Sequence, residues 1–207
     1  MKRCVIVGGA GIRRYDVIRK CLSPEDDVIF CDSGLNHMEA LGVVPSLIVG
    51  DFDSHENPHI SAETIVLPRE KDDTDTVYAV KEAVRRGYEE FLLIGVIGER
   101  LDHTLGNVSV LLYLDSIGKR ARILDDYSEM EIVSEKPVFV SDSYAFFSLL
   151  NISGEAAGVT IRNARYPLEN AEITCEYQYG ISNEVLPGTD AEISVARGKL
   201  LLIKIRA

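Results

Sequence analysis

The 207-residue sequence has no long apolar run and comparatively little positive charge. No run reaches the roughly 18 apolar residues that a membrane-spanning helix needs, and the first residues lack the apolar stretch of a signal peptide. We therefore expect a soluble, cytoplasmic protein without a membrane partner. Its 22 Lys and Arg against 33 Asp and Glu give a net charge of −11. Because a field of that sign repels a polyanion, we expect no nucleic-acid partner.

Metal sites built on sulfur or imidazole are also missing. The four cysteines show no C-x-x-C or C-x-x-H spacing, and the four histidines are too scattered to form a histidine triad. We expect reduced thiols that are mostly buried as small apolar side chains. Any metal should therefore be held by oxygen atoms. The residues concerned are Cys4, Cys21, Cys31, Cys175, His37, His55, His59 and His103.

Two common nucleotide-binding motifs are absent. Gly8-Gly9-Ala10-Gly11 lacks the third glycine of the dinucleotide fingerprint at the right offset, and no GxxxxGK[ST] string occurs. The overall composition, 46% apolar and 27% charged, is by contrast ordinary for a globular protein. It excludes disordered and collagen-like chains, and the length fits one large domain or two small ones.

What the sequence does have is a change of pattern along the chain. Up to about residue 125, short β-rich apolar runs alternate with segments of helical period, as in a sheet covered by helices. Beyond that point, short apolar runs follow one another without a helix-length amphipathic segment between them. We predict an α/β domain with an open, mostly parallel sheet over residues 1–125, followed by an all-β, sandwich-like domain over 126–207.

Two helices are predicted in the first part, at 76–86 and at 105–114. Asp102 or Thr104 could cap the second helix. One face of the first helix is predicted to carry Val77, Val80, Lys81 and Val84. The main predicted strands lie at 4–7, 28–31, 47–49, 64–67, 91–94, 121–124, 131–133, 138–141, 145–150, 159–161, 192–195 and 200–205.

Acidic residues gather after one predicted strand. Asp51 and Asp53 follow the strand at 47–49, and two carboxylates on a turning backbone can converge on one hard cation such as Mg²⁺. An Asp-rich turn with a capping serine, Ser54, is the alternative. Because ligands of open α/β sheets bind at the carboxyl ends of the strands, this position favours a site.

A second acidic cluster, 71–76, comes about twenty residues later, at the start of the first predicted helix. Asp73, Thr74 or Asp75 could simply cap that helix. Three crowded carboxylates nevertheless repel one another, and a bound divalent ion relieves this repulsion. Together the two clusters predict Mg²⁺ bound to a polyphosphate.

Two further strand-end loops fit the same crevice. The glycines of 95–104 permit close backbone approach, and Arg100 can bind phosphate through two hydrogen bonds. His103 in this loop is either a proton shuttle or a structural hydrogen-bonding residue. In the loop after the strand at 28–31, Asp32 could face the crevice and Asn36 could bond a ribose or base.

Four such loops in this order resemble the thiamine pyrophosphokinase family. In the second part of the chain, two further segments look like the family's thiamine-site segments. DxD alone is common, but the ordered combination is specific and covers nearly the whole chain. The matching segments are 32–37, 45–54, 71–75 and 95–107, and then 165–168 and 180–184.

The resemblance implies a homodimeric, Mg²⁺-dependent enzyme that transfers the diphosphoryl group of ATP to the hydroxyl of thiamine and releases AMP. Such a transfer needs charge neutralisation and alignment more than covalent catalysis. On this basis the catalytic residues and Mg²⁺ ligands would be Asp51, Asp53, Asp72 and Asp75, with Asp51 or Asp75 as the proton acceptor. ATP and its phosphates would contact Asp32, Asn36, Lys71, Thr74, Gly98, Arg100, Asp102 and His103. Thiamine would contact Tyr166, Ser182 and Asn183.

The sequence departs from the family in one respect, because it contains no tryptophan. Where family members stack an aromatic ring on thiamine, Tyr166, Tyr177 or Tyr179 would have to substitute, or the ligand packs on aliphatic side chains. The alternative functions are a metal-dependent phosphohydrolase, a nucleotide-sugar transferase and a non-enzymatic nucleotide sensor. The first two leave the segments 166–168 and 182–183 without a role.

Overall fold

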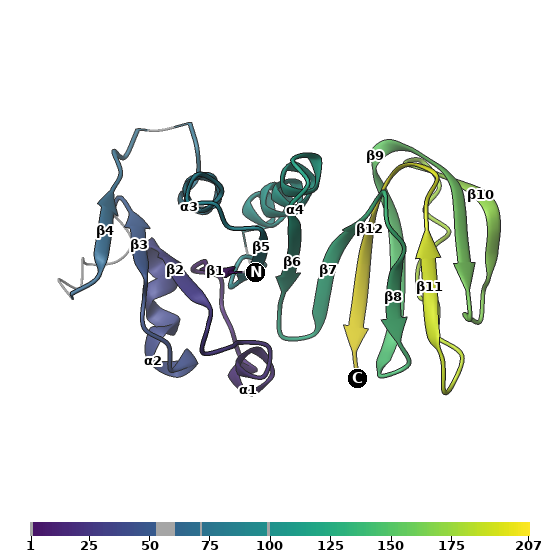
Figure 1. The fold of residues 1–207 in the computed structure, drawn as a ribbon, viewed down its shortest axis with the longest axis horizontal. Coiled ribbons are helices and arrows are strands. Elements are labelled where there is room, and N and C mark those ends of the chain that lie inside the picture. The colour runs from purple at the N-terminus through teal and green to yellow at the C-terminus, as the bar shows by residue number, and fades with distance from the viewer. Residues whose placement is uncertain (1, 53–60, 71, 99) are drawn as a thin grey trace. The chain divides into compact units, whose positions relative to one another are not determined.

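The computed structural model describes residues 2–52, 61–70, 72–98 and 100–207. The chain divides into two compact units, Met1–Asp126 and Tyr127–Ala207, which we call the first and the second unit. Figure 1 shows helices and strands in the first unit and strands in the second. No helix in the described part of the chain is long and apolar enough to cross a membrane.

The first unit is built on a parallel sheet. Its neighbouring strands follow the order β4-β3-β2-β1-β5-β6, and every pair is parallel. The chain runs outward from β1 to β4 and then returns to β5 on the other side of β1, so a topological switch point lies between β1 and β5. The strands are β1 (Arg3–Val7), β2 (Asp27–Cys31), β3 (Leu47–Gly50), β4 (Glu63–Val66), β5 (Glu90–Ile94) and β6 (Arg120–Leu124).

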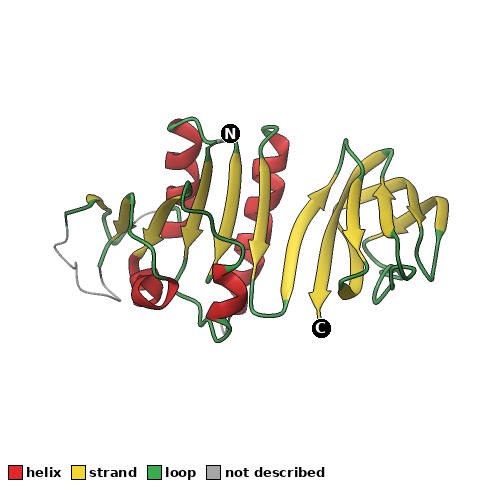
Figure 2. Ribbon diagram, turned by 60° about the horizontal axis from the view of Figure 1, so that its bottom comes forward, coloured by secondary structure: helices red, strands yellow, loops and turns green. Residues whose placement is uncertain are grey.

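Helices cover both faces of this sheet, as Figures 1 and 2 show. α1 and α2 lie on one face, and α3 and α4 lie on the other. Because both faces are covered, the central strands are buried almost throughout, which explains their nearly continuous apolar sequences. The helices are α1 (Tyr15–Arg19), the 3₁₀ helix η1 (Asp32–His37), α2 (Met38–Leu41), α3 (Asp75–Arg85) and α4 (Leu101–Ser116).

The second unit is all-β, and its strand pairs are antiparallel. The strand order is β7-β12-β9-β11-β8, with β10 also paired to β9. β9 is 19 residues long and pairs with β12, β10 and β11 along its length, so its buried side chains contribute to one core around Phe147 and Leu149. The strands are β7 (Ser128–Val133), β8 (Val138–Ser141), β9 (Tyr144–Arg162), β10 (Leu168–Thr174), β11 (Asp190–Ser194) and β12 (Arg197–Arg206).

Buried charge also occurs in the second unit. The Nζ atom of Lys204 lies 2.6 Å from Glu129 Oε1 and 2.7 Å from Glu131 Oε1. Burial alone would lower the pKa of Lys204, but the two carboxylates outweigh it and raise that pKa. The ammonium group therefore remains charged and paired inside the unit.

The predicted fold class is confirmed: a mostly parallel α/β part precedes an antiparallel β part. Every predicted strand overlaps an observed one, but β10 was not predicted, and β9 was predicted as two separate strands. The four cysteines are free; Cys4 and Cys31 are buried in the sheet, whereas Cys175 is exposed.

The predicted cap of the second helix was wrong, and the predicted face of the first helix is buried only in part. α4 begins at Leu101, so Asp102 and Thr104 lie inside it, and its N-cap residue Arg100 makes no side-chain capping bond. The Thr104 hydroxyl instead accepts a hydrogen bond from Gly98 N at 3.1 Å. On the predicted face of α3, Val80 is buried and Val77 and Val84 are half-buried, but Lys81 is exposed. The buried residues of this helix are Ala79, Val80, Glu82 and Ala83.

Candidate active site

A cleft of about 380 Å³ lies at the carboxyl ends of the strands in the first unit. Its lining comes from the loop after β1, from the end of β2 and η1, from the residue after β3, from the segment between β4 and α3, and from the starts of α3 and α4. This is the edge of the sheet at which the switch point between β1 and β5 opens. The lining residues are Gly8, Gly9, Cys31, Asp32, Ser33, Asp51, Arg69, Asp72, Asp73, Thr74, Asp75, Thr76 and His103.

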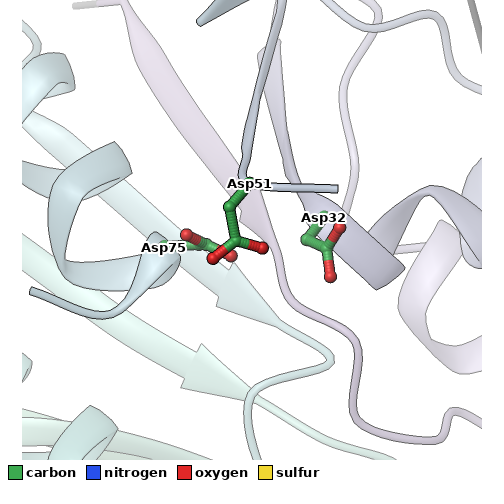
Figure 3. A group of neighbouring side chains, drawn as sticks. All are labelled: Asp32, Asp51 and Asp75. Atoms are coloured by element: carbon green, nitrogen blue, oxygen red, sulfur yellow. The ribbon is translucent and has the colours of Figure 1, made fainter. Parts of the chain in front are cut away.

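Three carboxylates meet in this cleft. Asp32 opens η1, Asp51 follows β3 directly, and Asp75 opens α3. One carboxylate oxygen from each lies within 4.8 Å of the others, and Figure 3 shows the three side chains gathered in one place. Oxygen ligands of this kind suit a hard divalent cation such as Mg²⁺, which also reduces the repulsion between the negative charges. The residues present therefore fit a magnesium site.

Backbone geometry brings Asp32 and Asp51 together. The parallel register pairs Cys31 with Val49, so the residues that follow these two strands leave the sheet at the same level. A Cβ atom on Gly50 would lie only 3.1 Å from the Cα and Cβ atoms of Asp32. Glycine at position 50 therefore permits the close approach that places the two carboxylates side by side.

Asp75 is placed by the start of α3. The Thr74 hydroxyl caps this helix by accepting a hydrogen bond from Val77 N at 3.3 Å. Lys81, two turns along the helix, binds both carboxylate oxygens of Asp73 at 2.7–2.8 Å. A carboxylate in the first helical turn is stabilised by the unbonded N–H groups there, so Asp75 is accommodated at the cleft.

The loop after β1 forms another wall of the cleft. Gly8 N donates to Ile94 O at 2.9 Å, which ties the loop to the end of β5. A Cβ atom on Gly9 would lie 1.9 Å from the Ser33 hydroxyl oxygen. A side chain here would displace Ser33, so glycine keeps both loops in place and leaves bare backbone at the cleft wall.

In the second unit, Asn183 fixes the backbone of Tyr166. Its Oδ1 accepts hydrogen bonds from Tyr166 N at 3.0 Å and Glu184 N at 2.9 Å, and its Nδ2 donates to Tyr166 O at 2.8 Å. Asn183 is buried, whereas the Tyr166 side chain is 58% exposed, with the Arg165 guanidinium 5.7 Å from its ring centroid. Ser182 is also exposed and adopts a φ of +59°.

Each of the two units matches a known family model. Residues 18–123 match the model of the thiamin pyrophosphokinase catalytic domain, and residues 132–200 match the model of the thiamin pyrophosphokinase vitamin B1 binding domain. The chain belongs to the thiamin pyrophosphokinase family. The family resemblance read from the motifs is thereby confirmed.

Individual relatives agree with this family membership. Thiamine pyrophosphokinase of Bacillus subtilis (strain 168) is 27% identical over 181 residues, which cover 84% of each chain. The crystal structure of thiamin pyrophosphokinase from Geobacillus thermodenitrificans is 26% identical, with a TM-score of 0.86 over 99% of this chain and 98% of that one. The yeast thiamin pyrophosphokinase structure, 13% identical, shares the fold with a TM-score of 0.75, over 99% of this chain and 86% of that one.

Within this family architecture, the predicted metal ligands divide into three groups. Asp51 and Asp75 belong to the cluster of three carboxylates, and Asp32 is its third member. Asp72 lines the same cleft without belonging to that group. Asp53 lies outside the described residues.

The residues predicted for ATP are also divided. Thr74 and His103 line the cleft, and Lys71 lies outside the described residues. Arg100 and Asp102 pair with each other at 2.7 Å, with side chains 71% and 65% exposed. The Arg100 guanidinium holds the pKa of Asp102 below its usual value, so this carboxylate stays ionised. The predicted residues that are not among those lining the cleft are Asn36, Gly98, Arg100 and Asp102.

Sequence reasoning missed several residues of the cleft. Gly8 and Gly9 could have been found, because they follow a predicted strand directly and glycine at a strand end permits close ligand approach. Arg69 precedes the second acidic cluster, and nothing in its sequence context marks it. The lining residues that were not predicted as site residues are Gly8, Gly9, Cys31, Ser33, Arg69, Asp73 and Thr76.

Proposed function

We propose that this chain transfers the diphosphoryl group of ATP to the hydroxyl group of thiamine in a Mg²⁺-dependent reaction that releases AMP. The observation that carries this proposal is the group formed by Asp32, Asp51 and Asp75, in a cleft at the switch point of a thiamin pyrophosphokinase catalytic domain. We further expect a homodimer in the cytoplasm, without a nucleic-acid or membrane partner.

The three carboxylates would hold Mg²⁺, and Asp72, nearby in the cleft, and Asp53 remain candidates for further ligands. The ion would supply neutralisation of phosphate charge and alignment of the transferred group. Asp51 or Asp75 would accept the proton of the thiamine hydroxyl, since both carboxylates belong to the group in the cleft.

The triphosphate of ATP would lie along the bare backbone of Gly8 and Gly9. Backbone N–H groups of such glycine loops can approach phosphate oxygens closely. Among the described residues that line the cleft, Arg69 carries the guanidinium, so we assign it to the phosphates in place of Arg100, which pairs with Asp102. Thr74 and His103 would complete the phosphate side of the cleft.

Thiamine would contact the second unit at Tyr166 and Ser182. Both side chains are exposed, and the segment lies within the match to the vitamin B1 binding domain. The thiazolium ring of thiamine is a cation, and the face of a tyrosine ring attracts cations. Asn183 would act indirectly, because its amide is already bonded to the backbone of Tyr166 and of Glu184.

The test is incubation of the purified chain with ATP and Mg²⁺, with and without thiamine, followed by chromatography of the products. Equal amounts of AMP and thiamine diphosphate, formed only when thiamine is present, are expected. Inorganic phosphate released without thiamine would instead support a phosphohydrolase. ATP binding without turnover would support a nucleotide sensor, and both results would contradict the proposal.

A further inference from the structure

His37 is a buried histidine, 6% exposed, at the end of η1 in the first unit. Its Nε2 lies 3.0 Å from Ala10 O, and its Nδ1 lies 2.7 Å from the Tyr15 hydroxyl. A carbonyl oxygen only accepts hydrogen bonds, so Nε2 carries the proton and Nδ1 accepts from Tyr15. Burial lowers the pKa of His37, which favours this neutral form.

The bond to Ala10 closes one side of the loop after β1. On the other side, Ala10 N donates to Gly95 O at 2.8 Å and Gly8 N donates to Ile94 O. The backbone donor and the backbone acceptor of Ala10 are thus both bonded, one to the end of β5 and one to His37. Gly8 and Gly9, which line the cleft, directly precede this fixed residue.

The other end of η1 carries the opposite part of the cleft. Asp32 and Ser33 stand there, and the Ser33 hydroxyl lies where a side chain on Gly9 would be. The distance between the glycine wall and Asp32 therefore depends on how η1 and the β1 loop are joined. His37 supplies a side-chain bond between them.

We propose that His37 is a positioning residue whose bond to Ala10 holds the Gly8–Gly9 wall at the distance from Asp32 that the triphosphate of ATP requires. This inference rests on the proposed use of the cleft for ATP. It assigns to His37 no contact with the substrate. Its effect should therefore appear in the affinity for ATP rather than in the chemical step.

Two variants of equal polarity separate the two bonds of His37. In His37→Gln the carboxamide nitrogen reaches the place of Nε2 and can still donate to Ala10 O, whereas His37→Asn reaches only the place of Nδ1. We expect His37→Asn to raise the KM for ATP about tenfold, as the loss of about 1.4 kcal/mol in binding would, with little change in kcat. His37→Gln should keep the KM within about twofold of the original value.

Two tyrosine variants provide a matched control. Tyr15→Phe removes the hydroxyl that orients the His37 ring, and we expect a rise in the KM for ATP. Tyr88→Phe removes a similarly placed hydroxyl, which donates to Asp27 Oδ2 at 2.6 Å at the amino end of β2, away from the cleft. It should lower the unfolding temperature by a similar amount but leave the KM for ATP unchanged.

Direct ATP binding without thiamine, measured as a Kd by titration calorimetry, makes the test independent of turnover. Equal ATP affinities for His37→Gln and His37→Asn would overturn the inference alone. An increase of the KM for ATP in Tyr88→Phe as large as that in Tyr15→Phe would also overturn it, because the KM would then depend on the stability of the fold and not on the position of His37. An original chain that binds no ATP would overturn the inference together with the proposed function.

Discussion

Asp32 adopts a backbone conformation that few side chains tolerate. Its φ is +40°, a left-handed value at which Asp and Asn are the commonest residues after glycine. Its Oδ1 atom is buried, so a substitution should also preserve the size and shape of the side chain. Asparagine satisfies both constraints, and it removes the charge while preserving the shape.

The Asp32→Asn variant should therefore fold normally but lose activity, because it binds Mg²⁺ more weakly. We expect the rate at a fixed Mg²⁺ concentration to fall about 10²-fold and to recover in part as Mg²⁺ is raised. Asp142→Asn, which changes the same charge in the second unit where Asp142 Oδ2 accepts from Gly188 N, should behave like the original chain. A full rate in Asp32→Asn at low Mg²⁺ would contradict the metal assignment.

Arg69 allows a second test at the scale of one side chain. Because a guanidinium can bind phosphate through two charge-assisted hydrogen bonds, Arg69→Ala should raise the KM for ATP about tenfold or more. Arg69→Lys keeps the charge but loses the paired geometry, and an intermediate KM is expected. Steady-state kinetics measure both, with Arg162→Ala, an exposed arginine of the second unit, as the control. An unchanged KM in Arg69→Ala would remove this residue from the phosphate site.

At the scale of elements, the sequence predicted every strand except β10, including β4 and β8 at the ends of the strand order. β1, β2, β3 and β5 are continuous apolar runs, so their pattern stands out. β10 carries only one buried side chain, Ile173, because it pairs with β9 alone and its other residues are exposed or half-buried. β9 was predicted as two strands with a break over residues 151–158, yet β12 pairs with β9 at Asn151 and again at Ala156 and Ala157.

The cluster formed by Asp32, Asp51 and Asp75 shows how far local sequence pattern could predict the site. Asp51 and Asp53 attracted attention because they are close in sequence. Asp32 is nineteen residues from Asp51, and only the pairing of β2 with β3 in the register Cys31 to Val49 makes them neighbours. Residue types were therefore predictable from local pattern, whereas the members of the group depended on strand pairing.

α3 is joined to β4 by charged side chains, which predicts a dependence of stability on pH. Glu82 accepts hydrogen bonds from Arg85 and Arg86, and Arg86 also binds Glu63 on β4. The bond from Arg85 is the main cause that lowers the pKa of Glu82 to about 2, with Arg86 adding to it. Because the pKa of Glu82 is lower in the folded state, its ionised form stabilises the fold. This stabilisation is fully present above the unfolded value of 4.5 and is lost as the pH falls toward 2.

Glu82→Gln removes this titration. At pH 7 we expect the free energy of unfolding of the variant to be about 2 kcal/mol lower than that of the original chain, because the variant loses charge-assisted hydrogen bonds. The difference should shrink as the pH falls from 4.5 to 2, because the original Glu82 then becomes neutral as well. Urea unfolding at several pH values measures it. A difference that stays constant over this range would show that Glu82 acts through packing instead.

For the whole molecule, the order of motifs was more informative than any single motif. DxD alone is compatible with hydrolases and transferases, but here acidic and glycine-containing loops follow successive strands, and a β part follows them. The matches to a catalytic domain over 18–123 and to a vitamin B1 binding domain over 132–200 reproduce this order. If each unit binds one of the two substrates, a substitution in one unit should change the affinity for one substrate and not for the other.

Tyr166→Ala tests this separation from the second unit. The loss of an aromatic face for the thiazolium cation should raise the KM for thiamine about tenfold, while the KM for ATP stays unchanged. Arg69→Ala should show the converse pattern. Phe139→Ala, which removes another exposed aromatic ring, on β8, is the control and should change neither KM.

The two variants together decide between separate and shared binding surfaces. If Tyr166→Ala raises the KM values for both substrates in parallel, the second unit contributes to the nucleotide site as well. If it changes neither, Tyr177 or Tyr179, whose rings lie 5.4 Å apart and are exposed, becomes the aromatic contact to test next. Only a selective rise for thiamine agrees with a first unit that binds ATP through its carboxylates and glycine wall and a second unit that binds the acceptor.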